Sequence, residues 1–161
     1  MRPLIGRTIG DQFDATCAAH PDRLALVVRH QDVRWTYADL KSRVDAFAAG
    51  LVGLGLQVGD RIGVWAPNCA EWTVAQFATA RAGLILVNIN PAYRLSEAEY
   101  ALNKVGCKLL VTMARFKTSD YLGMLRELAP EWAHGTPGQL ESQQLPHLHT
   151  VVWIDESGVG E

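Results

Sequence analysis

The stretch that decides the fold is "GLILVNINPAYRLSEAEYALNKVGCKLLVT", residues 83–112. It begins with an apolar run over 83–89 and ends with a second apolar run over 107–112. Between them, apolar residues recur at helical spacing over 97–105, and Gly106 is suited to ending a helix. A strand, a helix and a strand in this order predict a βαβ unit with a right-handed crossover and parallel strands. Such strands are buried on both faces, so continuous apolar runs are expected.

The same pattern extends toward the N-terminus. An apolar run over 61–66, which Pro67 ends, predicts another buried strand, and 69–82 continues as a helix. The preceding segment "TYADLKSRVDAFAAGLVGLGL" has apolar residues in steps of three and four, which predicts an amphipathic helix. Gly53 and Gly55 are suited to ending that helix.

These elements together predict an α/β fold, with a partly parallel sheet built from βαβ units and flanking helices. A helix is also expected over 116–130. The whole chain, 1–161, is expected to be one partial domain. Its expected parts are an N-terminal helix and β-hairpin over 1–36, a βαβ core over 37–129, an irregular connection over 130–149 and a final strand over 150–154.

Four expected helix starts share one pattern of residues. A residue that can cap a helix with its side chain is followed, three positions later, by an acidic residue, as in a capping box. The pairs are Thr8 with Asp11, Thr36 with Asp39, Asn68 with Glu71, and Ser96 with Glu99.

Cys69 follows Asn68 and raises the question of a catalytic thiol. A thiol at a helix N-terminus has a lowered pKa, so a small flavodoxin-like thiol enzyme is one hypothesis. Against it, Glu71 opposes that shift, and no histidine lies nearby in the sequence to act as a base. The repeated capping pattern favours a structural role for this segment, in which Asn68 and Glu71 start the helix.

Composition excludes several functional classes. A formal net charge of −2 gives no broad basic surface for nucleic acid or an anionic membrane. The longest apolar runs, such as 84–87, are too short for a transmembrane segment. The three cysteines lack C-x-x-C spacing, which argues against a disulfide framework or a zinc site. This cysteine pattern also suits a reducing cytoplasm, and the start "MRPLIGRTIG" lacks the apolar core of a signal peptide, so we expect a cytoplasmic chain. No metal site is expected.

The loop after the run 83–89 is the main candidate binding segment. Neither a G-x-G-x-x-G motif after a strand nor a G-x-x-x-x-G-K-[ST] motif occurs in the sequence. Asn90, Pro91, Tyr93 and Arg94 instead lie at the carboxyl end of a predicted parallel strand, where ligand crevices form. They are substrate-proximal candidates. The alternative is that the asparagine and proline only build a rigid turn.

Several stretches together resemble a known family. They are "HPDRLALV", "WTYADL", "GLGLQVGDRIGVWAPNCAEW", "AQFATARAGLILVNINPAYRLSEAEYALNKVGCKLLV" and "VVWID". In order and spacing they resemble the N-terminal portion of AMP-forming acyl-CoA synthetases of the medium- and long-chain fatty-acid type, within the adenylate-forming superfamily. The resemblance runs from Ile5 to Asp155.

The resemblance implies an enzyme that uses ATP and Mg to convert a carboxylic acid into an acyl-adenylate, then transfers the acyl group to coenzyme A. It also implies that the phosphate loop, the aromatic-Thr-Glu motif, the ribose-binding Asp and the catalytic Lys belong to segments absent from these residues. No catalytic residue is therefore carried over, and no cofactor is expected to bind this chain alone. Arg115 and Lys117 follow the strand 107–112 and are candidates for contact with the coenzyme A nucleotide, the alternative being solvated surface charges.

The expected function is that of an N-terminal fragment of a fatty-acid–CoA ligase, inactive by itself. The expected partners are the remainder of the synthetase or a second copy, which would cover exposed apolar surface. Fatty acid and coenzyme A are the ligands implied for the full enzyme. A non-catalytic regulatory or interaction module derived from the same family is the alternative.

Overall fold

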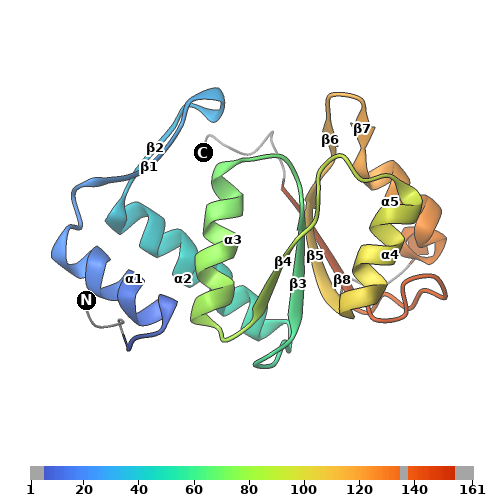
Figure 1. Cartoon of the computed structure of the whole chain (residues 1–161), viewed down its shortest axis with the longest axis horizontal. Helices are drawn as coiled ribbons and strands as arrows, with labels where there is room; N and C mark the ends of the chain where they lie inside the picture. The colour runs from blue at the N-terminus through green and yellow to red at the C-terminus, as the bar shows by residue number, and fades with distance from the viewer. Residues whose placement is uncertain (1–5, 135–137, 155–161) are drawn as a thin grey trace, which may run out of the picture. The chain divides into compact units, whose positions relative to one another are not determined.

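A computed structural model, which describes residues 6–134 and 138–154, confirms the expected α/β class (Figure 1). Residues 135–137 of the expected irregular connection lie outside the described residues. The elements in chain order are α1 (Ile9–Ala19), β1 (Leu24–Val28), η1 (Arg29–Gln31), β2 (Val33–Thr36), α2 (Tyr37–Gly53), β3 (Arg61–Trp65), α3 (Ala70–Arg81), β4 (Ile85–Asn88), α4 (Leu95–Val105), β5 (Cys107–Met113), β6 (Arg115–Phe116), β7 (Ser119–Asp120), α5 (Tyr121–Leu128), η2 (Pro130–His134) and β8 (Thr150–Ile154).

The chain forms two compact units. The first unit consists of Met1–Val58 and Cys69–Leu84, and its described elements are the β1–β2 hairpin and helices α1, α2 and α3. The second unit consists of Gly59–Asn68 and Ile85–Glu161 and contains the main sheet with α4 and α5. The chain therefore leaves the second unit after β3, forms α3 in the first unit, and returns for β4.

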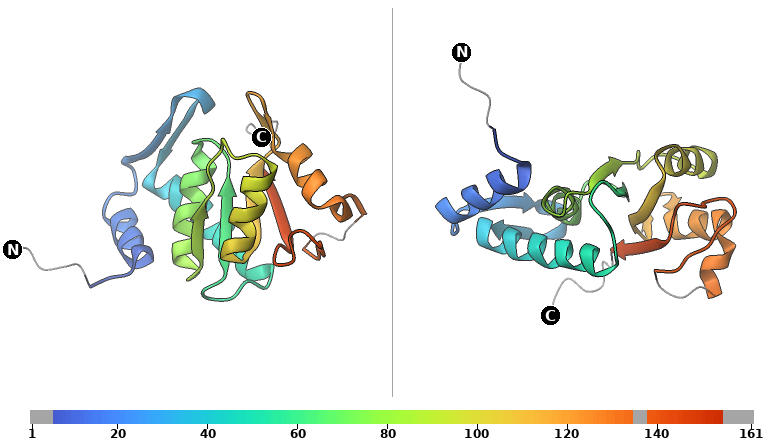
Figure 2. Two further views of the ribbon diagram at one scale, coloured as in Figure 1. Left: turned by 45° about the vertical axis from the view of Figure 1, so that its right-hand side comes forward. Right: turned by 90° about the horizontal axis from the view of Figure 1, so that it is seen from below.

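The main sheet has four strands in the order β4-β3-β5-β8, and all neighbouring strands are parallel. Helices α4 and α5 pack against β5 and against each other (Figure 2). The strand interiors are deeply buried, with Ile62, Val64, Leu109 and Leu110 fully excluded from solvent. This explains the continuous apolar runs of β3 and β5, because the inner strands of a parallel sheet are covered on both faces. The edge strands β4 and β8 are not fully buried, so the burial on both faces expected for the run 83–89 is wrong for β4, where Ile85 is 46% exposed.

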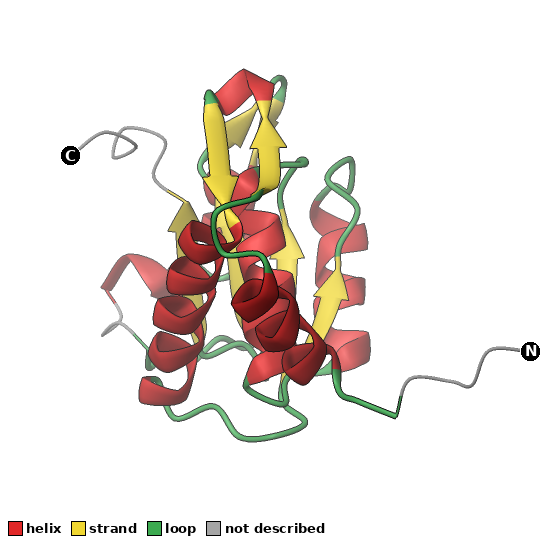
Figure 3. Ribbon diagram, turned by 90° about the vertical axis from the view of Figure 1, so that its left-hand side faces the viewer, coloured by secondary structure: helices red, strands yellow, loops and turns green. Residues whose placement is uncertain are grey.

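The first unit is built around helix packing. Phe13 of α1 and Phe77 of α3 stack with ring centroids 4.4 Å apart. Leu40, Val44 and Leu51 of α2 are buried on one face, as their spacing predicts. Figure 3 shows the β1–β2 hairpin with the short helical turn η1 at its tip.

The start of α3 corrects the expected cap. The helix begins at Ala70, its N-cap is Cys69, and Asn68 forms no cap hydrogen bond. Instead, the Gln31 side chain accepts a hydrogen bond of 2.7 Å from the Ala70 backbone N–H. Its amide also donates to the Glu71 carboxylate over 2.9 Å. A side chain from the tip of the hairpin therefore supplies the cap that the local sequence does not.

The other helix starts follow the expected pattern in two of three cases. Thr36 and Asp39 form a full capping box, and Thr8 accepts from the Asp11 backbone N–H. The expected pair at α4, Ser96 with Glu99, is wrong by two residues. The N-cap of α4 is Arg94, whose backbone N–H donates to the Glu97 carboxylate over 2.9 Å.

The helix expected over 116–130 is also shorter than predicted. A tight antiparallel hairpin, β6 with β7, precedes it, and α5 begins only at Tyr121. Lys117 at the tip of this hairpin has a φ of 52°, the left-handed conformation common in tight turns. Asp120 then caps α5 by accepting from the Gly123 backbone N–H. No helix within 6–134 or 138–154 is both long and apolar enough to cross a membrane.

Candidate functional site at the carboxyl edge of the sheet

The loop after β4 is tied to the strand beside it. The Ile89 backbone N–H donates to the Val64 carbonyl over 3.0 Å, which continues the strand pairing beyond β4. The Trp65 indole N–H donates to the Asn90 carbonyl over 3.2 Å. Trp65 is fully buried, and the Thr112 hydroxyl donates to its carbonyl. The candidate residues that follow Ile89 therefore begin from a fixed point on the sheet.

Asn90 and Pro91 form a hydrogen-bonded turn. The Asn90 side-chain oxygen accepts from the Ala92 backbone N–H. The Asn90 backbone carbonyl accepts from the Tyr93 backbone N–H at 3.0 Å. The Pro91 carbonyl accepts from the Tyr121 hydroxyl, also at 3.0 Å. These hydrogen bonds support the rigid-turn interpretation for Asn90 and Pro91.

Tyr121 anchors the loop from the other side. Its ring meets the Trp65 ring edge-on with centroids 4.9 Å apart, and the residue is fully buried. Burial raises the pKa of its phenol, which keeps the hydroxyl protonated as a donor to the loop.

Arg94 brings the two sets of sequence candidates together. Its guanidinium donates to the Ser119 hydroxyl over 2.7 Å, and Ser119 lies on β7, in the hairpin that carries Arg115 and Lys117. Arg115 is paired with Asp120 at 2.6 Å. Lys117 makes no ion pair with any residue in the described ranges, and its ammonium lies 5.3 Å from the Phe116 ring centroid. Lys117 is thus the more available cation of the two.

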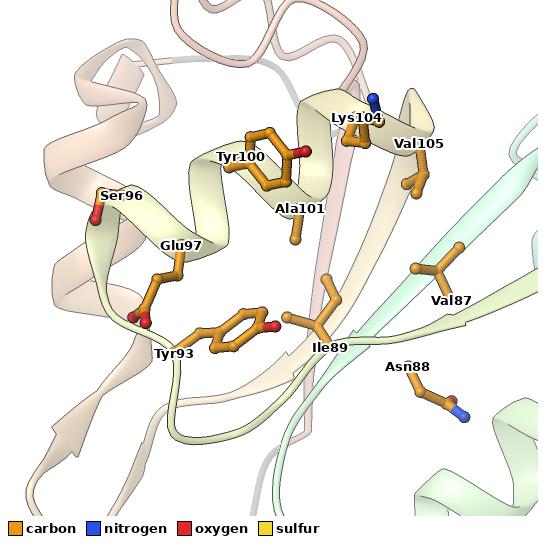
Figure 4. Close-up of a pocket in the computed structure, with 10 residues that line it drawn as sticks. All are labelled: Val87, Asn88, Ile89, Tyr93, Ser96, Glu97, Tyr100, Ala101, Lys104 and Val105. Atoms are coloured by element: carbon orange, nitrogen blue, oxygen red, sulfur yellow. The ribbon is translucent and has the colours of Figure 1, made fainter.

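Tyr93 points into a groove between β4 and α4, which we call the β4–α4 groove (Figure 4). The groove has a volume of about 390 Å³, within the range of small-molecule sites. In the close-up, the Tyr93 ring extends toward Ile89, while Tyr100 and Lys104 project from α4. The lining residues that matter for binding are Ile89, Tyr93, Glu97, Tyr100, Ala101 and Lys104. The Glu97 carboxylate accepts from the Arg94 backbone N–H, whereas Lys104 makes no ion pair with any residue that the structure describes.

Three residues of this edge were missed from the sequence: Trp65, Ser119 and Tyr121. Each anchors a candidate residue and is not itself in the loop. The available signal was the position of Trp65, an indole N–H donor at the end of a predicted strand, since a buried indole requires an acceptor. Together, the edge offers cations, hydrogen-bond donors and aromatic surface, which are groups that bind and orient a ligand.

The hypothesis of a Cys69 nucleophile is not supported. The thiol is buried, and burial raises its pKa to about 11, with the Glu71 charge acting in the same direction. Cys107 is also buried, which raises its pKa to about 12. Thiols of this kind are almost fully protonated at neutral pH, so they are poor nucleophiles.

Comparison with known proteins identifies the family. Residues 13–159 match the model of the AMP-binding enzyme family. The chain is 50% identical over 152 residues to a medium-chain acyl-CoA ligase, ACSF2, from Bos taurus, covering 94% of this chain and 25% of the relative. It is 37% identical over 154 residues to a putative acyl-CoA synthetase, YngI, from Bacillus subtilis, covering 96% of this chain and 28% of that protein. The chain thus spans about a quarter of the length of these relatives.

Solved structures agree on the fold. A fatty acyl-CoA synthetase from Mycobacterium tuberculosis superposes with a TM-score of 0.77 at 21% identity, covering 93% of this chain and 27% of that chain. A putative long-chain fatty-acid–CoA ligase from Rhodopseudomonas palustris superposes with a TM-score of 0.75 at 25% identity. The match covers 92% of this chain and 33% of that chain. These likenesses confirm the architecture expected from the resemblance.

The cytoplasmic location expected from the sequence is contradicted by the relatives. The bovine ligase and its human counterpart, which is 49% identical over 152 residues, are both named as mitochondrial. The expectation failed because unpaired cysteines indicate only that no disulfide framework is needed, which does not identify one compartment. The family itself is clear from the match over 13–159: the chain belongs to the AMP-binding enzymes.

Proposed function

We propose that this chain is the N-terminal part of an AMP-forming ligase that joins a medium-chain fatty acid to coenzyme A. The observation that carries the proposal is the 50% identity, over 152 residues, to a medium-chain acyl-CoA ligase. In such an enzyme ATP activates the acid as an acyl-adenylate, and the acyl group then passes to coenzyme A.

The role of this chain in that reaction is binding and positioning. The rigid turn at Asn90 and Pro91, held by Trp65 and Tyr121, presents Tyr93 and Arg94 at the carboxyl edge of the sheet. Ligands of open α/β sheets bind at this edge. We place the acyl substrate or the coenzyme near these residues.

Arg115 and Lys117 suit a phosphate of coenzyme A to different degrees. The Lys117 ammonium has no carboxylate partner in the described part of the chain, so it can approach a phosphate without losing an ion pair. Arg115 must first exchange its 2.6 Å contact with Asp120 for the phosphate. Lys117 is therefore the stronger candidate for nucleotide contact.

The proposal also states that these 161 residues alone do not catalyse the reaction. The phosphate loop and the catalytic lysine motif that the resemblance implies for ATP chemistry do not occur in them. Apolar surface in the second unit, including Ile85 and Tyr100 at 46% and 66% exposure, is proposed to contact the remainder of the synthetase or a second copy.

ATP–pyrophosphate exchange with octanoate tests the proposal. The chain alone should give only background exchange. A chimera in which it replaces the matching 152 residues of the human ligase should exchange pyrophosphate and form the thioester. Exchange by the chain alone would overturn its proposed inactivity. A folded chimera that binds ATP yet shows no exchange would overturn the functional assignment, and if the chain then bound the human enzyme, an interaction module would be favoured.

A substitution within the chimera tests the nucleotide contact. Lys117→Gln should raise the KM for coenzyme A several-fold while leaving pyrophosphate exchange unchanged, since exchange precedes coenzyme binding. Arg34→Gln, which removes an exposed cation on β2, is the matched control and should change neither quantity. Equal effects of both substitutions would assign Lys117 to general surface charge.

A further inference from the structure

The first unit contains a cavity that the proposed function does not use. Its volume is about 420 Å³, comparable with small-molecule sites. Ile9, Phe13 and Phe77 supply its apolar wall, and Arg7, Gln12 and Tyr37 add polar groups. All of them belong to the first unit, whereas the loop at Asn90 belongs to the second.

The apolar wall is preformed. Phe13 and Phe77 stack at 4.4 Å and an interplanar angle of 19°, so their position is fixed by packing between α1 and α3. Ile9 beside them is 65% exposed, which is unusual for a large aliphatic side chain at the start of a well-packed helix. A ligand with an apolar body would remove this surface from water, at a gain proportional to the area covered.

Two polar donors at the cavity have no partner among the residues that the structure describes. These are the Arg7 guanidinium and the Tyr37 hydroxyl, for which no hydrogen bond or ion pair is formed with residues 6–134 or 138–154. None of the described residues that line the cavity carries a carboxylate. Asp11, in the first turn of α1, accepts a hydrogen bond from the hydroxyl of Thr8, a lining residue. The cavity therefore combines an apolar wall with a positive charge that no carboxylate of the described residues pairs with.

We propose that this cavity binds an amphiphilic monocarboxylate, with the carboxylate on Arg7 and Tyr37 and the apolar body against Ile9, Phe13 and Phe77. Arginine pairs with carboxylates through two parallel N–H donors, which fixes the orientation of the bound acid. The charge selects an anion over a neutral amphiphile, and one cation among the described lining residues suits a monocarboxylate. The proposal does not depend on the ligase function, because it concerns a different unit of the chain.

Titration of the isotope-labelled chain with octanoate, followed by two-dimensional NMR, tests the proposal. Saturable shifts should cluster at the amides of Thr8, Phe13, Tyr37 and Phe77, with a Kd on the order of 1 mM or below. Arg7→Gln should weaken binding about tenfold or more, as loss of a charged hydrogen bond does. Arg34→Gln is the matched control and should leave the Kd unchanged.

Two further measurements separate this occupant from others. Ile9→Ser, at an exposed position, should weaken octanoate binding without unfolding the chain, whereas 1-octanol should bind the unaltered chain at least several-fold more weakly than octanoate. Equal binding of octanol, shifts located elsewhere, or no saturable shift would overturn the proposal. It would also be overturned if raising the protein concentration alone moved the same amides, since a second copy would then be the occupant. None of these results bears on the exchange assay.

Discussion

Gln31 carries out two tasks with one side chain. Its carbonyl oxygen accepts from the Ala70 N–H, and its amide donates to the Glu71 carboxylate. The first turn of a helix has unpaired N–H groups, and a side-chain acceptor stabilises the helix by satisfying one of them. The tip of the β1–β2 hairpin is therefore joined to α3 by two hydrogen bonds.

Replacing Gln31 by Ala should lower the free energy of unfolding by about 1–2 kcal/mol, the cost of a lost cap and a lost bond to a charge. Asn68→Ala is the matched comparison and should cost less, because Asn68 is exposed and does not cap the helix. Urea unfolding measures both. If Asn68→Ala lowered the free energy of unfolding more than Gln31→Ala, Asn68 and not Gln31 would be the residue that caps α3.

The cysteines lead to a second prediction at the residue scale. Because burial raises the pKa of Cys69 to about 11, little thiolate is present at pH 8, and Cys17 and Cys107 are buried as well. A colorimetric thiol reagent should therefore react slowly with the native chain and rapidly after denaturation. Cys69→Ala should leave the native rate nearly unchanged. Fast loss of one thiol in the native chain, abolished by this substitution, would contradict the buried assignment.

Among the elements, β3 is an inner strand of the main sheet, between β4 and β5, and it is closely packed at its centre. Gly63 lies at its centre, and a Cβ atom added there would lie 3.0 Å from side-chain atoms of Ile89, Cys107 and Leu110. The strand therefore requires glycine for space and not for backbone conformation, since its φ is not positive. The close packing places the following residue pair, Val64 and Trp65, against the loop of the candidate site.

Gly63→Ala should lower the free energy of unfolding by about 1–3 kcal/mol through overpacking of the core. Gly50→Ala on α2 is the matched control, because nothing lies within 4 Å of its added Cβ. That substitution should raise stability by about 0.5–1 kcal/mol through better helix propensity. Chemical denaturation of the two variants measures both values, and similar effects of the two substitutions would contradict the packing at β3.

At the scale of the whole molecule, charge sets the expected response to acid. In the first unit, Asp14 of α1 contacts Lys41 and Arg81, which lie on α2 and α3. The hydrogen bond from Arg81 holds the pKa of Asp14 below its ordinary value of 3.8. Backbone hydrogen bonds from Thr36 and Gly123 do the same for the pKa values of Asp39 and Asp120. A pKa lowered by folding means that the unfolded chain binds protons more readily in acid.

The stability from these carboxylates should be fully present above the ordinary aspartate pKa and lost as the pH falls through their lower folded values. Urea unfolding between pH 7 and pH 3 measures this loss. In Asp14→Asn, the free energy of unfolding should fall less between pH 7 and pH 3 than in the unaltered chain. At pH 7 the substitution should lower it by about 1 kcal/mol or less, because the ion pairs of Asp14 are partly exposed. Asp22→Asn, which removes no ion pair with a described residue, is the control. The prediction would be contradicted if Asp14→Asn lost as much free energy of unfolding between pH 7 and pH 3 as the unaltered chain.

The parts of the fold that the sequence predicted are those with a local pattern. The apolar runs identified β3, β4, β5 and β8 to within two residues, and Thr36 with Asp39 identified the start of α2. The pattern failed at β6 and β7, where two-residue strands are too short to show a period. In the candidate site, the loop from Asn90 to Arg94 was predicted, but Trp65, Ser119 and Tyr121 were not.

By itself, the sequence determined the βαβ order, the buried inner strands β3 and β5 and the family, because periodicity and residue order are properties of neighbouring positions. Only the tertiary structure decided that Gln31 caps α3, across 39 residues, and that Arg94 bonds Ser119, across 25. It also decided that Arg7, Phe13 and Phe77 line one cavity. A hydrogen-bond partner or a cavity wall depends on which distant segments packing brings together, and no local pattern records that choice.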